Sequence, residues 1–296
     1  GINLSDYVSD SIPGVPAITL SASLADTLLT RSPRHAWYGH PRLNPDWEPD
    51  HSSRADLGTA AHALLLESDG SRLVVIDAKD WKKPANQDAR DAAWAEGKVP
   101  ILAPKLVDIE AMVAEANRVI AVSEFAGDWQ DAESEVTIAW DDDGTWCRSR
   151  PDRLTTDRRI AWDYKTASNA EPGAWLRGPL LAGNDLQAAF VVRGLSVIAQ
   201  TAATLVFVVQ EIYPPYAVTF VGLSPTFLAW AEQKRRQAVA LWAECLAKNI
   251  WPAYPERVCY AEPPAWSLAQ WAERWGYEAP GVVDDGRPLA EQLDGP

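Results

Sequence analysis

The sequence predicts an α/β fold in which a central mixed β-sheet is flanked by helices. The expected elements follow the order helices, β meander, helix, two strands and a long helix, which indicates a sheet covered by helices and not a regular βαβ repeat. The chain has 296 residues, of which 47% are hydrophobic and 23% charged, and is therefore long enough for a large globular core.

The first part of the chain predicts mostly helices. Residues 1–20 contain several Pro and Ser residues and predict an irregular segment. "SASLADTLLT" and "SPRHAWYGH" each predict a short helix, and Ser32 followed by Pro33 is typical of a helix start. After a short apolar strand, "RLVVIDA", residues 88–122 predict a helical region that is interrupted near residues 97–104.

"DLGTAAHALLLES" predicts a strong helix with Asp56 as its cap. Gly58, His62 and Leu66 fall on one face of this helix at i, i+4 spacing. A histidine on an apolar face is commonly a core residue, so the pattern alone leaves His62 as either a core side chain or a ligand. Glu67 falls on a different face and is expected to be structural.

The segment from Ser134 to Thr166 predicts three strands, "SEVTIAW", "TWCRSRPDRL" and "IAWDYKT", joined by the turns "DDDG" and "TTDRR". If the second turn has its tip at residues 157–158, Asp152 lies opposite Asp163, with the two Cβ atoms about 5 Å apart. Residues i and i+2 of a strand share a face, so Lys165 projects beside Asp163. The sequence therefore predicts two acids and a lysine in one small cluster.

Two carboxylates at this separation repel each other, which raises one pKa or recruits a cation. Oxygen ligands of this kind suit Mg²⁺ or Mn²⁺, and a neighbouring lysine can steady a phosphate charge or an attacking hydroxide. An exposed hairpin with scattered charges would satisfy the same pattern. Glu135 precedes the hairpin and either reaches the site through a water or lies on the surface.

The remaining chain predicts a helix at "NDLQAAFVVRGLSVIAQ", strands at "ATLVFVVQEIY" and "YAVTFVGL", and a long helix over residues 224–248. We expect one domain over residues 1–250. Residues 251–296 form a Pro-rich, acidic tail with one short helix, expected near residues 267–275.

Charge and composition exclude some classes of protein. The net charge of -14 argues against a uniformly basic nucleic-acid-coating protein, although a local basic groove and ordinary scattered charge both stay open. No apolar run reaches the roughly 18 residues of a membrane span. The three cysteines are widely spaced and predict reduced thiols in a cytoplasmic protein.

Four motifs together resemble one enzyme family. "RPDRL" and "IAWDYKT" resemble the core of the PD-(D/E)XK nucleases, with Asp152 after its proline and Asp163 and Lys165 as the D-x-K pair. "LGTAAHALLLE" resembles the helix motif of RecE-type (exonuclease VIII-like) phage and prophage exonucleases, whose histidine corresponds to His62. "LQAAFV" resembles their glutamine motif, at Gln187. With the N-terminal helices, the resemblance covers roughly residues 21–240 in the family's order.

The resemblance implies a metal site and roles for individual residues. His62, Asp152, Asp163 and the Tyr164 carbonyl would bind Mg²⁺, with Mn²⁺ as a substitute. Lys165 would orient the attacking water, and Gln187 would position the nucleophile or the DNA. Three unclustered cysteines argue against the iron–sulfur cluster of some relatives. Val191 stands where the glutamine motif often has a tyrosine.

We expect four further residues to contact DNA. Arg31, Ser32 and Arg34 lie in an acid-free stretch at a helix start, where backbone N–H groups favour a 5′ phosphate. Arg150 adds a positive charge near the two acids.

The implied function is metal-dependent exodeoxyribonuclease activity on linear double-stranded DNA ends, from 5′ to 3′, in phage or prophage homologous recombination. The resemblance also implies a ring-shaped trimer or tetramer and a RecT-like single-strand annealing protein as partner, in the cytoplasm of a bacterial host cell. A structure-specific endonuclease on the same core and a catalytically silent DNA-end-binding protein stay open. A carbohydrate-binding protein, suggested by the fifteen tryptophans, would leave the ordered motifs unexplained.

Overall fold

The structure, a computed structural model, describes residues 2–48, 57–66 and 71–276. The chain divides into two compact units, Gly1–Pro252 and Ala253–Pro296. The first unit contains the α/β fold, and the described part of the second contains helix α11 (Ala265–Trp275). The expectations for Asp56 and Glu67 concern positions outside the described residues.

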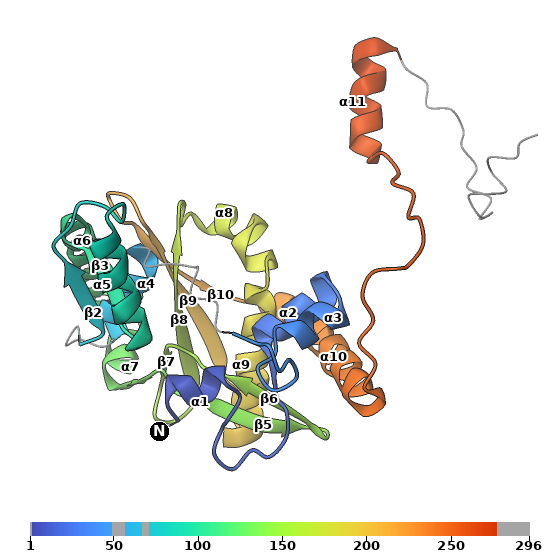
Figure 1. Cartoon of the computed structure of the whole chain (residues 1–296), viewed down its shortest axis with the longest axis horizontal. Helices are drawn as coiled ribbons and strands as arrows, with labels where there is room; N and C mark the ends of the chain where they lie inside the picture. Colours follow the sequence, from blue (N-terminus) through green and yellow to red (C-terminus); the bar gives the residue numbers. More distant parts are fainter. Residues whose placement is uncertain (1, 49–56, 67–70, 277–296) are drawn as a thin grey trace, which may run out of the picture. The chain divides into compact units, whose positions relative to one another are not determined.

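A five-stranded mixed sheet forms the centre of the first unit, in the order β10-β9-β8-β7-β4 (Figure 1). Strands β8 and β9 are parallel and the other neighbours are antiparallel. The predicted α/β fold with a mixed central sheet is therefore confirmed. The strands are β4 (Glu133–Ser134), β7 (Arg153–Leu154), β8 (Ile160–Ala167), β9 (Thr204–Glu211) and β10 (Val218–Gly222).

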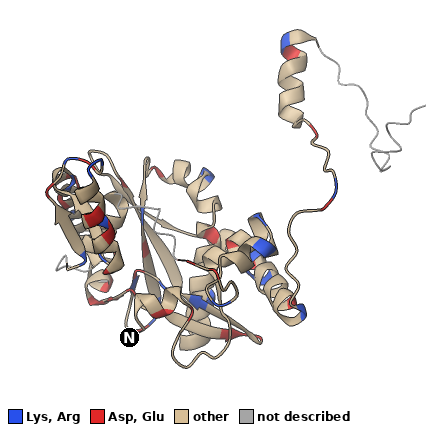
Figure 2. Cartoon of the chain, viewed as in Figure 1, with Lys and Arg blue, Asp and Glu red and all other residues tan. Residues whose placement is uncertain are grey.

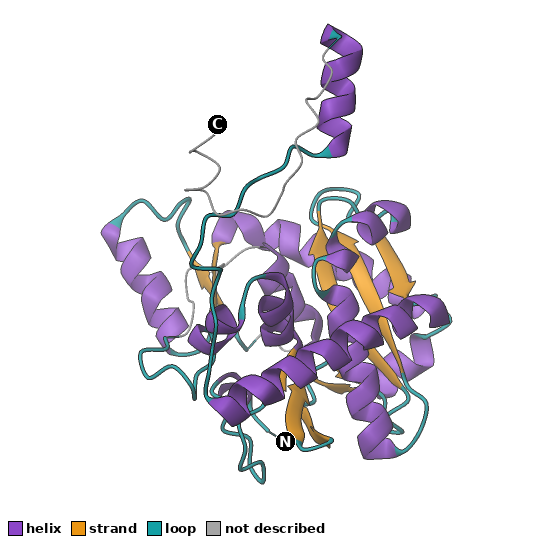
Figure 3. Ribbon diagram, turned by 90° about the vertical axis from the view of Figure 1, so that its right-hand side faces the viewer, coloured by secondary structure: helices purple, strands orange, loops and turns teal. Residues whose placement is uncertain are grey.

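Helices cover both faces of this sheet (Figures 1 and 3). One face carries a three-stranded sheet and five helices: β1 (Leu20–Ser21), β5 (Ile138–Asp142), β6 (Thr145–Ser149), α2 (Ala22–Thr30), α3 (Pro33–Tyr38), α8 (Pro172–Arg177), α9 (Asn184–Ala199) and α10 (Pro225–Lys248). The other carries α4 (Leu57–Leu66), α6 (Ala103–Ala121), α7 (Ala126–Asp131) and the parallel pair β2 (Leu73–Ile76) and β3 (Val99–Leu102), on which α5 (Pro84–Ala95) packs.

The alternation of side chains along β8 and β9 divides the core in two, because successive residues of a strand point to opposite faces. Ala161 packs with the α9 side, whereas Trp162 and Tyr164 pack with the α4 side. On the α9 side, Gly194 allows a close approach, since a Cβ there would lie 2.6 Å from the ring of Trp140.

Two elements contradict a specific expectation. The supposedly irregular N-terminus contains helix α1 (Leu4–Val8), whose cap, Asn3, accepts a hydrogen bond from the Asp6 N–H. The supposed helical interruption near residues 97–104 contains strand β3, which pairs in parallel with β2. A short apolar run such as "VPIL" carries no periodicity that separates strand from helix, so only its pairing with β2 decides its conformation.

The expected single strand "TWCRSRPDRL" is also wrong. Strand β6 ends at Ser149 in the three-stranded sheet, and β7 begins at Arg153 in the five-stranded sheet. The chain therefore changes sheets over residues 150–152. Pro151 suits this passage because it has no N–H to donate to a ladder. Asp152 lies at the point of entry into the central sheet.

The remaining expectations concern cysteines and membrane spans. Cys147 and Cys245 are buried thiols, and Cys259 is an exposed thiol. None of the helices in the described part of the chain combines the length and apolar character that crossing a membrane requires.

Candidate active site

The candidate site lies at an open edge of strand β8. Strand β7 pairs with β8 only through Arg153 opposite Trp162 and Leu154 opposite Ala161. This register places Asp152 level with Asp163, as the sequence predicts. Strand β8 continues to Ala167, and among the described strands none pairs with it on this side beyond Trp162. Because β7 is so short, the β8 backbone beside Asp152 has no partner strand on this side among the described residues.

Asp152 occupies the place that a further strand residue would take. Its Oδ2 accepts a hydrogen bond from the Tyr164 N–H at 2.7 Å. In an extended strand, the N–H and C=O of one residue point to the same side. The carbonyl of Tyr164 is therefore directed to the open edge beside Asp152, which is where the predicted metal ligand belongs.

Asp163 joins two other predicted site residues. Its carboxylate is buried, with Oδ2 2.6 Å from Nζ of Lys165 and Oδ1 accepting a hydrogen bond of 2.5 Å from Nε2 of Gln187. Gln187 reaches Asp163 from α9, because Asp163 shares a face of β8 with Ala161 and that face is covered by α9. The structure thus brings Asp163, Lys165 and Gln187 together.

Burial and the neighbouring charge shift the pKa values of the acid and the lysine. Burial, followed by repulsion from Asp152, raises the pKa of Asp163 to about 6, against the opposing charge of Lys165. Burial lowers the pKa of Lys165, but the charges of Asp163 and Asp152 outweigh it and hold that pKa above its ordinary value. Each carboxylate is thus close enough to change the protonation of the cluster.

His62 approaches the cluster from α4. Its Nε2 lies 3.0 Å from Oδ1 of Asp152, and its ring centroid lies 6.3 Å from that of Tyr164. The side chain is 29% exposed, so it is not enclosed in an apolar core. Burial lowers the pKa of His62. The hydrogen bond and the charge of Asp152 raise this pKa by more than burial lowers it, so the net shift is upward.

A pocket of about 290 Å³ opens beside His62 and Asp152, and part of its wall was not predicted. Glu135 lies in this wall: its N–H donates to the Asp152 carbonyl at 2.7 Å, and its carboxylate pairs with Arg150 at 3.1 Å. Thr59 and Ala63 line the pocket beside His62, within the same helix motif. No motif marked the other lining residues, which come from distant parts of the chain: Leu4, Tyr7, Arg72 and Val99.

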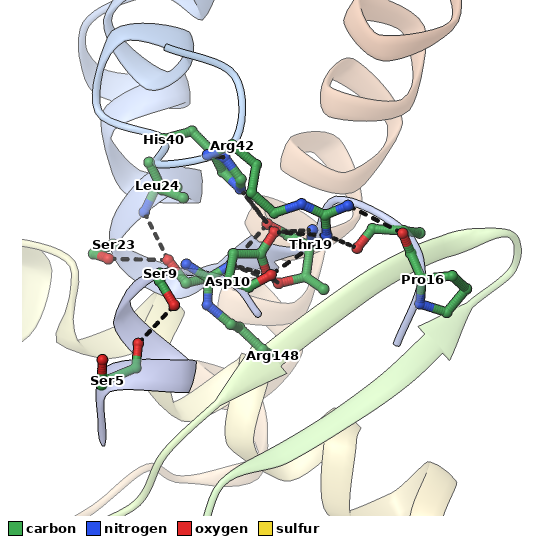
Figure 4. A network of polar contacts seen from close by, with 12 residues as sticks. Ser5, Ser9, Asp10, Pro16, Thr19, Ser23, Leu24, His40, Arg42 and Arg148 are labelled. Carbon is green, nitrogen blue, oxygen red and sulfur yellow. Dashed lines mark hydrogen bonds and ion pairs between the residues drawn. The ribbon is translucent and has the colours of Figure 1, made fainter. Parts of the chain in front are cut away.

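A buried ionic network holds the N-terminal segment near this pocket (Figure 4). The Asp10 carboxylate accepts hydrogen bonds from the Thr19 N–H and hydroxyl and lies 2.8 Å from Nη1 of Arg148. His40 Nε2 lies 3.3 Å from the same carboxylate. Arg148 also places its guanidinium carbon 5.3 Å from the ring centroid of Tyr7. The network therefore connects β6 to helix α1, from which Tyr7 reaches the pocket.

The predicted DNA-binding residues divide into two places. Arg150 lies in the pocket wall, where it donates to Thr137 Oγ1 and to the Ile2 carbonyl and pairs with Glu135. The other three lie at α3, and none of the contacts described for Arg31, Ser32 and Arg34 joins them to the acidic pair.

At α3, the Ser32 hydroxyl caps its own helix by accepting from the His35 N–H. The Arg34 guanidinium lies 4.8 Å from the ring centroid of Trp37.

Val191, in the place of the motif's tyrosine, is fully buried in the core. Acidic and basic residues are interspersed on the helices of this unit (Figure 2), as scattered surface charge would be.

The donor chemistry of the cluster fits a hard divalent cation. Two repelling carboxylates and a carbonyl supply the oxygen ligands that suit Mg²⁺ or Mn²⁺, and the imidazole would add one nitrogen donor. Within the described residues, no three His, Cys, Asp or Glu side chains already form a metal-binding arrangement. His62 instead contacts Asp152, and Lys165 contacts Asp163. The assignment of His62, Asp152, Asp163 and Tyr164 as ligands stays a prediction.

Known proteins resemble this chain in sequence pattern and in fold. The family model of the PD-(D/E)XK nuclease superfamily matches residues 19–259. A crystal structure from Eubacterium rectale, described as a "Putative exonuclease", superimposes with a TM-score of 0.56 at 11% identity, covering 90% of this chain and 98% of that chain. This likeness shows a shared fold.

A second solved structure, SSO0001, has a TM-score of 0.28 at 14% identity over 65% of this chain and 95% of that chain. No curated protein sequence matches. The family match spans most of the chain, and the acidic pair, Lys165 and Gln187 meet inside it. The chain therefore belongs to the PD-(D/E)XK nuclease superfamily.

Proposed function

We propose that this chain is a divalent-metal-dependent exodeoxyribonuclease that degrades linear double-stranded DNA from the 5′ end. The observation that carries the proposal is the cluster of Asp152, Asp163, Lys165 and Gln187 at the open edge of β8, with His62 beside it. Membership of a nuclease superfamily and the shared fold with the Eubacterium rectale protein support hydrolysis of phosphodiester bonds.

The chain's own residues would hold the metal and stabilise charge. A bound Mg²⁺ or Mn²⁺ supplies Lewis acidity and lowers the pKa of a water. Asp152, Asp163 and the Tyr164 carbonyl would bind this ion, with His62 as the additional ligand. Lys165 stays protonated because its pKa is raised, and its ammonium stabilises negative charge that develops on the phosphate. Gln187 orients the Asp163 carboxylate through its 2.5 Å hydrogen bond.

The biological setting of the proposal rests on the sequence resemblance. The resemblance to RecE-type exonucleases supports 5′-to-3′ polarity, a role in phage or prophage recombination in the bacterial cytoplasm, a ring-shaped trimer or tetramer and a RecT-like partner. Arg150 in the pocket wall, together with Arg31, Ser32 and Arg34, remains a proposed DNA contact.

The test compares three DNAs in one buffer at a stated salt concentration: linear duplex with 5′ phosphates, the same duplex dephosphorylated, and covalently closed circles. With Mg²⁺, we expect release of mononucleotides from the first, a slower start on the second and survival of the third. Equal cutting of closed circles would favour the endonuclease. Tight binding to ends without any cutting would favour the silent end-binding protein.

A further inference from the structure

A second pocket, of about 460 Å³, is lined in part by α4 and β8, two elements that also contribute to the candidate site. Thr166, Ala167 and Ser168 directly follow Lys165 on and after β8, and they form one side. Leu57 and Gly58, at the start of α4, form another, little more than one turn before His62. The pocket therefore neighbours the candidate site along both β8 and α4.

The walls of this pocket are mainly apolar. Ile101, Ile109 and Ile212 provide aliphatic surface, Trp81 provides an aromatic ring, and Lys105 is the basic residue of the lining. The Lys105 side chain is 54% exposed, and its Nζ lies 3.5 Å from Asp108, so it retains contact with solvent. An apolar pocket with one aromatic ring and one exposed cation suits a flat, weakly polar group that carries an anion beside it.

Size and position identify that group further. The volume lies within the range of about 300 to 1,000 Å³ that is usual for small-molecule sites. Strands rise about 3.3 Å per residue, so Ser168 lies only about 10 Å along the chain from Lys165. A phosphate at Lys165 would thus have its neighbouring nucleotide within reach of the pocket.

We propose that this pocket receives the base of the nucleotide next to the scissile phosphate, which stacks on Trp81 while Lys105 faces the DNA backbone. The inference rests on the proposed nuclease function and deepens it. Stacking on an aromatic ring tolerates every base, and the aliphatic walls offer few hydrogen-bonding groups to a base edge. The pocket therefore selects an unpaired base without selecting its identity, and the DNA strand is opened by at least one nucleotide at the site.

The test measures DNA binding without cleavage. The full chain with Lys165→Ala is titrated with labelled duplexes that have a 5′ phosphate and a single abasic position, moved one nucleotide at a time from the end. We expect one position at which loss of the base weakens the affinity about tenfold. Adding Trp81→Ala should weaken binding of the intact duplex by a similar factor and abolish the difference between intact and abasic DNA.

Trp94→Ala is the matched control. Trp94 and Trp81 both lie near the Arg90 guanidinium, at 4.7 Å and 5.9 Å from ring centroid to guanidinium carbon, but Trp94 does not line the pocket. Its substitution should leave the abasic penalty unchanged. A second variant, Lys105→Glu on the exposed side of α6, should weaken binding of intact and abasic duplexes equally and is not expected to disturb folding.

The outcomes distinguish failure of the base-binding proposal from failure of the nuclease proposal. Equal affinity at every abasic position, or an abasic penalty that persists in Trp81→Ala, would refute base binding in this pocket. If the wild-type chain still degrades DNA, the proposed nuclease function stands. Absence of DNA binding and cleavage in every variant, including the wild type, would refute both. Melting curves confirm that each variant is folded. If Trp81→Ala does not fold, the abasic scan with the Lys165→Ala chain carries the test.

Discussion

Gly58 and Thr166 are in direct contact across the interface between α4 and β8. A Cβ atom on Gly58 would lie only 2.4 Å from Oγ1 of Thr166. Gly58 precedes His62 by one helical turn on the same face, and Thr166 follows Lys165. The missing side chain therefore sets how closely α4 approaches β8, and with it the 3.0 Å contact between His62 and Asp152.

Gly58→Ala should reduce nuclease activity at least tenfold. The added methyl group forces α4 away from β8 or Thr166 out of its rotamer, and overpacking of this kind costs about 1 to 3 kcal/mol of the free energy of unfolding. Thr166→Ala should restore much of the activity to Gly58→Ala, because it removes Oγ1 and Cγ2. The assay compares initial rates on linear duplex with melting temperatures.

Gly127→Ala on α7 is the control for this pair, since nothing lies within 4 Å of a Cβ at that position. It should leave activity unchanged. Full activity in Gly58→Ala would show that His62 does not depend on the close approach of α4.

Lys165→Ala should abolish cleavage while changing DNA affinity little. One charge among several phosphate contacts contributes modestly to binding, but the ammonium that stabilises the developing phosphate charge is lost. Turnover and dissociation constants measured at one salt concentration separate the two effects. Asp163→Ala should lose both metal binding and turnover, and undiminished turnover in either variant would remove that residue from the mechanism.

Stability of the metal-free protein should fall as the pH rises from about 4 to about 6. The folded pKa of Asp163, about 6, lies above the value of 3.8 for an unperturbed Asp. In this window the folded state therefore binds more protons at Asp163 than the unfolded state, so the free energy of unfolding decreases with pH, by up to about 3 kcal/mol from this group.

Urea denaturation of the wild type and of Asp163→Asn between pH 4 and pH 8 tests this linkage. Asp163→Asn has no titrating carboxyl at this position, so its free energy of unfolding should fall less between pH 4 and pH 6. Mg²⁺ should raise the stability of the wild type most above pH 6, where Asp163 is ionised. Parallel curves for the two proteins would contradict the raised pKa.

Gln187→Ala should move the acid side of the pH–rate profile to higher pH. The amide of Gln187 donates to Asp163 Oδ1 and favours its charged form, so its loss raises the pKa of Asp163 further. Gln187→Glu should not rescue the profile, because a second carboxylate repels Asp163. A lower rate with an unmoved profile would indicate that Gln187 acts on the DNA and not on Asp163.

A chain that ends at Pro252 should keep its fold and its metal affinity. Trp251 packs against Trp242, with ring centroids 5.1 Å apart, and the Pro252 carbonyl accepts from the Arg34 N–H. A chain that ends at Asn249 lacks both contacts and should lose about 3 kcal/mol of stability. Calorimetry with Mn²⁺ on both truncated chains is the measurement. Loss of metal binding in a folded 1–252 chain would place part of the site in the second unit.

The sequence alone determined the mixed sheet with flanking helices and the approach of Asp152 to Asp163. Both depend on local regularities: strand alternation, and a turn whose position sets the register of the hairpin. The same regularities put Lys165 beside Asp163. His62 and Gln187 were identified by resemblance to family motifs, since spacing along a helix does not show which element that helix will face.

Only the tertiary structure decided what completes the cluster. The contact of Gln187 with Asp163 requires α9 to pack on one face of β8, and the contact of His62 with Asp152 requires α4 to pack on the other. Tyr7 and Trp81 are brought to the two pockets from distant parts of the chain. Such contacts depend on the packing of whole elements across the sheet, which no local pattern of residues encodes.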